Sequence, residues 1–162
     1  MPPDKRRVMN ASNSILDAIS RTLDVQGRTS RPAFWWVFLC YICATIILVF
    51  LDFLLFEELV DVPVEAYFPL TDTFYLVSLV SITTLTMRRW HDAGFPSWPV
   101  VVVVAVDVIA TVLSYGKPEV AFIDDPLLVI ATMTGLASLA VCLLPSQKRD
   151  SKYGPNPNEV PQ

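Results

Sequence analysis

Residues 34–56 read FWWVFLCYICATIILVFLDFLLF, a run of 23 residues that contains a single charged side chain, Asp52. A helix needs roughly 20 predominantly apolar residues to cross the ~30 Å hydrocarbon core of a bilayer. Pro32 precedes the run, in a position that the first turn of a helix tolerates. Trp35 and Trp36 lie where an aromatic belt would meet the lipid headgroups. This stretch therefore predicts a membrane-spanning helix.

The composition of the whole chain agrees with a membrane protein. Of its 162 residues, 53% are hydrophobic and 17% are charged, whereas soluble domains have about 45–50% and about 25%. The length allows one domain. The first thirty residues lack the compact apolar core of a cleavable signal peptide. We therefore expect the first apolar run to remain as a membrane anchor.

Three more apolar blocks follow the first, and together they predict an all-α membrane protein built as a four-transmembrane-helix bundle. Residues 70–87 carry several hydroxyl side chains, which can bond back to their own helix. Residues 98–115 contain a valine run that its length and flanking aromatics assign to a helix and not to a strand. Residues 126–144 are rich in small side chains that let helices approach closely. Before the first span, residues 14–25 predict a short amphipathic helix at the membrane interface.

Charged residues are segregated between alternate ends of the four blocks. Eleven of the twelve lysines and arginines lie before the first block, between the second and third, or after the fourth. Because positively charged loops stay in the cytoplasm, this pattern places both termini there. The predicted organisation is a cytoplasmic N-terminal segment (residues 1–31), a four-span membrane domain (32–145) and a cytoplasmic tail (146–162).

Three short motifs at the predicted cytoplasmic ends carry a family resemblance. They are GRTSR at residues 27–31, RRWHD at residues 88–92 and KYGPNP at residues 152–157. The first two are followed by Phe34-Trp35 and by Gly94 and Ser97-Trp98, respectively. In this order the motifs resemble the bacterial membrane family catalogued as domain of unknown function 805, over roughly residues 20–157. The resemblance implies a multi-pass protein of the bacterial inner membrane, and it implies no activity.

Basic and polar side chains of these motifs could converge at the cytoplasmic face. Arginine forks suit phosphate oxygens, and basic pockets between membrane helices can hold anionic lipid headgroups. A competing interpretation is that the arginines only set the orientation and pair with acids such as Asp92 and Asp150. The candidate phosphate or lipid site comprises Arg28, Arg31, Arg88, Arg89, His91, Asp92 and Tyr153.

An enzymatic interpretation would depend on His91 and Asp92, because a carboxylate can orient an imidazole. No serine or cysteine stands in an obvious position for a nucleophile, and His91 is the only histidine in the chain. Cys40 and Cys43 have the spacing of a redox pair, but inside an apolar helix they are interpreted as small packing residues. We expect no catalytic residue, no metal and no cofactor.

Asp107 lies near the middle of the predicted span 98–115 and should face the interior of the bundle, because a charge in lipid is costly. It lies ~14 Å along the helix from Trp98, at the depth of Ser78 in the preceding span. Ser78 is therefore its predicted hydrogen-bond partner. The bond could be structural, or Asp107 could belong to a proton or cation path. Ala131 and Gly135 could pack helices either within the chain or between two copies.

These features predict a non-enzymatic membrane component that binds a partner protein or anionic lipid at its cytoplasmic face. The alternative is a small transporter or channel component with Asp107 in the path, and a third possibility is a membrane enzyme that uses His91. The expected partners are the lipid bilayer, anionic headgroups, and a membrane protein or a second copy of the chain. We expect no nucleic-acid partner.

Overall fold

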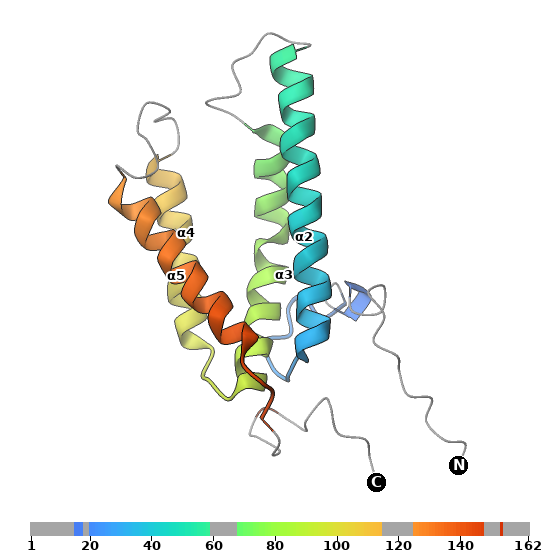
Figure 1. The fold of residues 1–162 in the computed structure, drawn as a ribbon, viewed down its shortest axis with the longest axis vertical. Coiled ribbons are helices and arrows are strands. Elements are labelled where there is room, and N and C mark those ends of the chain that lie inside the picture. Colours follow the sequence, from blue (N-terminus) through green and yellow to red (C-terminus); the bar gives the residue numbers. More distant parts are fainter. Residues whose placement is uncertain (1–14, 18–19, 59–67, 115–124, 148–152, 154–162) are drawn as a thin grey trace, which may run out of the picture.

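Four helices make up most of the described chain. The computed structural model describes residues 15–17, 20–58, 68–114, 125–147 and 153. The helices, labelled in Figure 1, are α2 (Arg31–Asp52), α3 (Pro69–Ala93), α4 (Trp98–Ser114) and α5 (Pro126–Leu143). A short π-helix, η1 (Phe53–Glu58), continues α2. These residue ranges contain no strand, so the prediction of an all-helical protein is confirmed for them.

Three of these helices are long and apolar enough to cross a membrane: Arg31–Leu55, Pro69–Ala93 and Pro126–Leu143. Helix α4 is also apolar but has only 17 residues. Many bulky apolar side chains point outward, among them Ile46, Val77 and Val112 at 63%, 74% and 65% exposure. A surface of this kind would be unfavourable in water. It identifies the chain as a membrane protein whose outer face meets lipid.

The helices form two pairs that diverge from a common end (Figure 1). Helix α2 packs along α3, and α4 packs along α5. The common end contains residues 28–34, 88–100 and 142–147, and we call it the arginine end. The opposite end contains Asp52, Asp72 and Asp125, and we call it the acidic end.

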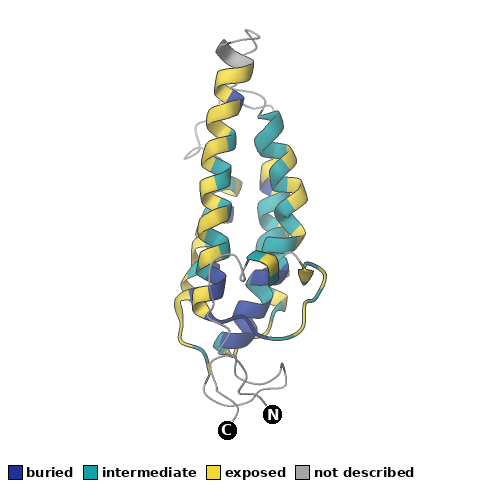
Figure 2. Cartoon of the chain, turned by 90° about the vertical axis from the view of Figure 1, so that its right-hand side faces the viewer, coloured by how far each residue is buried: buried dark blue, intermediate teal, exposed yellow. Residues whose placement is uncertain are grey.

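The apolar core lies at the arginine end. It consists of five buried side chains from all four helices: Phe34, Leu85, Trp90, Val100 and Cys142. Figure 2 shows most of the buried residues gathered near this end, whereas most other helical positions are exposed or half-buried; Asp52, Ala110 and Ala131 are buried farther along. Side-chain packing therefore joins the two helix pairs most firmly where the charged motifs also lie.

The motif at residues 88–92 is helical, not part of a loop as predicted. Helix α3 runs to Ala93, six residues beyond the predicted end of the second span. It can continue because Arg89 and Asp92 stand one turn apart and form an ion pair. It ends at Gly94, which adopts the left-handed conformation at φ +92° that favours glycine.

The predicted interfacial helix at residues 14–25 is described only in part. Residues 15–17 and Ser20 are helical and residues 21–23 form a turn, while Ser14 and Ile19 lie outside the described residues. The segment touches α3, because Thr22 Oγ1 lies 3.0 Å from Ser81 Oγ. Leu23 is 85% exposed. In the tail, Asp150 also lies outside the described residues.

Gly135 of α5 does not serve as a close contact between the described helices. A Cβ atom built at this position meets no atom within 4 Å, although Ala131 one turn earlier is buried. Alanine is better than glycine in a helix by up to about 1 kcal/mol. We therefore expect Gly135→Ala to raise the Tm slightly in a thermal-unfolding assay in detergent. A clear loss of stability would indicate that a second copy of the chain packs at this position.

Candidate functional site

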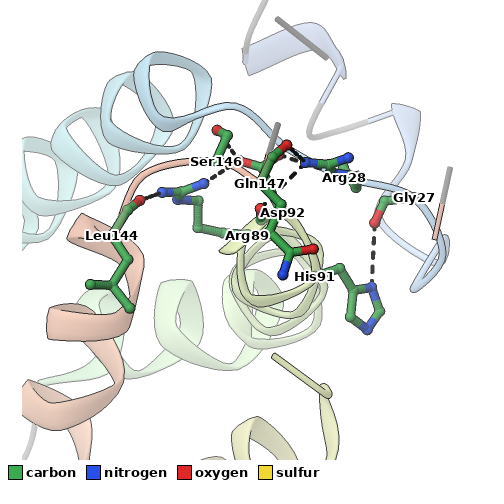
Figure 3. A network of polar contacts seen from close by, with 8 residues as sticks. All are labelled: Gly27, Arg28, Arg89, His91, Asp92, Leu144, Ser146 and Gln147. Carbon is green, nitrogen blue, oxygen red and sulfur yellow. Dashed lines mark hydrogen bonds and ion pairs between the residues drawn. The ribbon is translucent and has the colours of Figure 1, made fainter. Parts of the chain in front are cut away.

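Asp92, in the last turn of α3, is the centre of a buried polar network (Figure 3). Its carboxylate accepts hydrogen bonds from Arg28 Nε at 3.1 Å, from Arg89 Nη1 and from Ser146 Oγ. The side chains of Asp92 and both arginines are at most 1% exposed. The Asp92 carbonyl accepts the backbone N–H of Gln147 at 2.8 Å. The network therefore ties the segment before α2 and the segment after α5 to the end of α3.

The two arginines use further N–H groups to satisfy backbone carbonyls. Arg28 Nη2 donates to the Gln147 carbonyl at 2.6 Å. Arg89 Nε donates to the Cys142 carbonyl at 3.0 Å, and its Nη2 donates to the Leu144 carbonyl. Carbonyls at the end of a helix lack intrahelical partners, and Arg89 supplies partners to α5 from outside. The pairing with Asp92 that the competing interpretation predicted is present for Arg28 and Arg89, and both hold the fold together.

Arg88 is buried in a different environment. Its side chain is 0% exposed, and Asp17 Oδ2 lies 3.7 Å from its Nη1. Within the described part of the chain, no acceptor receives a hydrogen bond from its Nε, Nη1 or Nη2. The side-chain hydroxyls of Thr29 and Ser30 are also buried without a hydrogen-bond partner there. A buried guanidinium without acceptors costs several kcal/mol, so Arg88 is the least satisfied charge of the predicted site.

His91 and Tyr153 bring the third motif to the other two. The His91 ring stacks on the Tyr153 ring with 3.7 Å between the ring centroids, so Tyr153 lies against the end of α3. His91 Nδ1 lies 3.3 Å from the Gly27 carbonyl oxygen of the first motif. Arg31, the first residue of α2, is exposed. The predicted residues thus lie at one end of the helices. Arg28 and Arg89 belong to the buried network around Asp92, whereas Arg88 is a separate buried cation.

An exposed ion pair lies beside this end, in the segment that approaches Arg88. Arg21 Nη2 lies 2.6 Å from Asp24 Oδ2, and both side chains are more than a third exposed. The hydrogen bond from Arg21 lowers the pKa of Asp24 below its ordinary value. Exposed pairs of this kind contribute little stability, which makes this one a useful contrast to the buried network.

Asp107 of α4 accepts a hydrogen bond from the Tyr75 hydroxyl of α3 at 2.7 Å. The predicted partner, Ser78, instead donates to the carbonyls of Phe74 and Tyr75 in its own helix. A short hydroxyl side chain readily bonds to the preceding turn, whereas the longer tyrosine reaches the neighbouring helix. The predicted link between the second and third spans is therefore present, with Tyr75 one turn away as the donor.

Cavities lie around the Tyr75–Asp107 pair, between the two helix pairs. One of about 240 Å³ is lined by residues of all four helices, including Tyr41, Tyr75 and Asp107. A second cavity of about 210 Å³ is lined by the same three residues and by Asp72, among others. A third of about 450 Å³ is lined by Tyr75, Asp72 and residues of α4. Tyr75 borders all three.

Asp52, the single charged residue of the first apolar run, caps another helix. Its carboxylate accepts the backbone N–H groups of Leu70 and Thr71 at 3.0 and 2.9 Å, and the Thr71 hydroxyl at 2.8 Å. The side chain is 0% exposed. Asp52 therefore satisfies free amides in the first turn of α3, where the helix dipole also favours a negative charge.

The cysteines do not form a redox or metal site in the described residues. Cys40 and Cys43 are exposed on α2, and Cys142 is buried in the core; all three are free. The interpretation of Cys40 and Cys43 as packing residues is therefore wrong for the described helices, because both side chains are exposed. The described residues also contain no group of three or more His, Cys, Asp or Glu side chains that could hold a metal ion.

Residues 22–155 match the model of a family described as "Protein of unknown function (DUF805)". This range includes the first two motifs and the tyrosine that stacks on His91. Neither the curated proteins nor the solved structures give a match to the chain.

Proposed function

The chain belongs to DUF805, a family of unknown function, and we propose that it is a non-enzymatic membrane component that binds anionic phospholipid at its arginine end. In this proposal the shorter α4 also crosses the bilayer, so that four spans form the membrane domain. The arginine end faces the cytoplasm of a bacterial inner membrane. Support comes from the position of eleven of the twelve lysines and arginines at this end of the predicted spans.

The observation that carries the proposal is the buried guanidinium of Arg88, which has no hydrogen-bond acceptor among the described residues. Arg28 and Arg89 are saturated by Asp92 and by backbone carbonyls, which makes them unsuitable for a ligand. Arg88 retains a planar set of donors that matches the oxygens of a phosphate. Thr29, whose backbone N–H donates to the Arg88 carbonyl at 3.2 Å, adds a buried hydroxyl that has no hydrogen-bond partner in the described part of the chain.

A lipid headgroup suits this position better than a free phosphate. The segment that carries Asp17 toward Arg88 exposes Leu16 and Leu23, at 64% and 85%. Such side chains are favourable at a membrane surface, where their apolar atoms enter the acyl boundary. A phosphate held by Arg88 beneath this segment would lie at headgroup depth, with its acyl chains beside the apolar outer faces of the helices.

Arg88→Met tests the proposal. Methionine keeps a long side chain but offers no donor. We therefore expect phosphatidylglycerol to bind at least about tenfold more weakly, since a charged hydrogen bond is worth about 1.5–3 kcal/mol. The measurement is the rise in Tm with added lipid in a neutral detergent, together with bound lipid counted by native mass spectrometry. Without lipid, Arg88→Met should be as stable as the natural chain or more stable, because it removes a buried charge that makes no hydrogen bond to the described residues and has only a 3.7 Å ion pair with Asp17.

The matched control is Arg21→Met, which removes a half-exposed arginine that already has an acid partner. It should leave the lipid response unchanged. Inorganic phosphate is the second arm: a response equal to that of the lipid would assign the site to a soluble anion. Equal lipid responses in the natural chain and Arg88→Met would refute the proposal.

A further inference from the structure

We propose that the cleft between the two helix pairs binds a lipophilic organic cation, with the Asp107 carboxylate as its counter-charge. The site is separate from the arginine end and does not depend on lipid binding there. Val100 lines the 240 Å³ cavity and also belongs to the apolar core. The cleft therefore begins where the core ends, and it extends along α3 toward Pro69 at the acidic end.

The charge of the cleft favours a cation. Asp107 lines two of the cavities and Asp72 lines two, while no described lysine, arginine or histidine lines any of the three. Asp107 uses Oδ2 to accept the Tyr75 hydroxyl, and no described residue donates to its Oδ1. A carboxylate without a cationic partner inside a membrane protein creates a strong negative potential, because the surrounding dielectric constant is low.

The remaining lining favours an organic cation over a bare metal ion. Tyr41 stacks on Phe74 at 5.5 Å between the ring centroids, and both rings border a cavity that contains Asp107. Aromatic faces attract quaternary and aromatic cations. Thr83 and Thr86 also line the cleft, but their hydroxyls donate to carbonyls of their own helix. The lining therefore offers a metal ion few oxygen ligands and offers an organic cation aromatic faces.

The walls and the size of the cleft match such a ligand. Apolar side chains on both sides, Leu79 of α3 and Val104 of α4 among them, would contact the body of the ligand. The cavity of about 450 Å³ lies in the lower part of the range for small-molecule sites, roughly 300–1,000 Å³, and the cavity of about 240 Å³ lies just below that range. Gly135 leaves one wall open, since a Cβ there would meet nothing within 4 Å.

The test uses ethidium, an aromatic cation, and the full chain in nanodiscs of zwitterionic lipid, with fluorescence anisotropy as the readout. We expect saturable binding above that of empty nanodiscs, and at least about a tenfold loss of affinity in Asp107→Asn. Asp107→Glu, which keeps the charge, should retain most of the affinity. Asp24→Asn, which removes an acid outside the cleft, is the matched control and should bind like the natural chain.

Two further measurements separate loss of the site from loss of the fold. Gly135→Leu should fill the cleft and abolish ethidium binding without any change of charge, and its Tm shows whether the bundle is intact. The aromatic anion 1-anilinonaphthalene-8-sulfonate should not compete with ethidium. The proposal is overturned if the natural chain binds no more ethidium than empty nanodiscs do. It is equally overturned if Asp107→Asn binds as tightly as the natural chain.

Discussion

Asp92→Asn should lower the free energy of unfolding by about 3–5 kcal/mol, the largest effect that we expect from one substitution. The change keeps the size of the side chain but leaves Arg28 and Arg89 buried without a counter-charge. It also weakens the hydrogen bonds that hold the segments before α2 and after α5 against α3. Titration of the detergent-solubilised protein with SDS, followed by tryptophan fluorescence, measures the free energy. Trp90 in the adjoining core reports on this end directly.

Asp24→Asn is the matched control for Asp92→Asn. Both acids have an arginine three residues earlier as their partner, but the Arg21–Asp24 pair is exposed. Its loss should change the free energy of unfolding by at most about 1 kcal/mol. The double change Arg89→Met with Asp92→Asn should recover part of the stability, because it removes one of the two uncompensated charges. Equal effects of Asp92→Asn and Asp24→Asn would show that the buried network does not hold the fold.

Asp52→Asn should lower the free energy of unfolding by about 2–3 kcal/mol, because charge-assisted hydrogen bonds from the first turn of α3 are lost. An asparagine could orient only one oxygen toward the Leu70 and Thr71 amides, and its NH₂ group would face a donor. Hydrogen–deuterium exchange should rise at residues 70–73 and stay unchanged at the arginine end. This pattern distinguishes a local loss of capping from general unfolding.

Asp125→Asn provides the comparison for this second substitution. Asp125 caps α5 within its own chain segment, where its side chain accepts the Leu127 backbone N–H at 2.9 Å. Asparagine is about as good as aspartate at such a position, so the stability should hardly change. If Asp52→Asn were no more harmful than Asp125→Asn, the contact between α2 and α3 at the acidic end would not depend on the carboxylate.

The positions of these acids explain why a cleft can exist in so small a bundle. Asp52 fastens α2 to α3 at the acidic end, and Asp92 fastens the chain at the arginine end. Between the two helix pairs the apolar core occupies only the arginine end. Farther along, the Tyr75–Asp107 hydrogen bond joins α3 to α4, with cavities on its sides. A lipid site at one end and a cation site in the cleft are therefore compatible in one chain.

The sequence by itself determined that this is a membrane protein that is helical throughout the described residues, and that Asp107 faces another helix; it also predicts a shared side for eleven of the twelve lysines and arginines. These properties follow from local quantities: the length of an apolar run, the distribution of charge along the chain, and the cost of a carboxylate in lipid. Gly94 is visible in the sequence directly after residues 88–93, and α3 ends there, six residues beyond the predicted end of the second span.

Only the tertiary structure decided which polar groups meet. Arg88 and Arg89 are neighbours of the same type, yet one is saturated by Asp92 and by the end of α5, and the other lacks an acceptor among the described residues. The approach of separate helices likewise decided that Tyr75, and not Ser78, donates to Asp107. It also decided that Asp52 caps α3. A hydrogen bond depends on a few tenths of an ångström and on direction, and such geometry between distant segments is fixed by packing and not by sequence spacing.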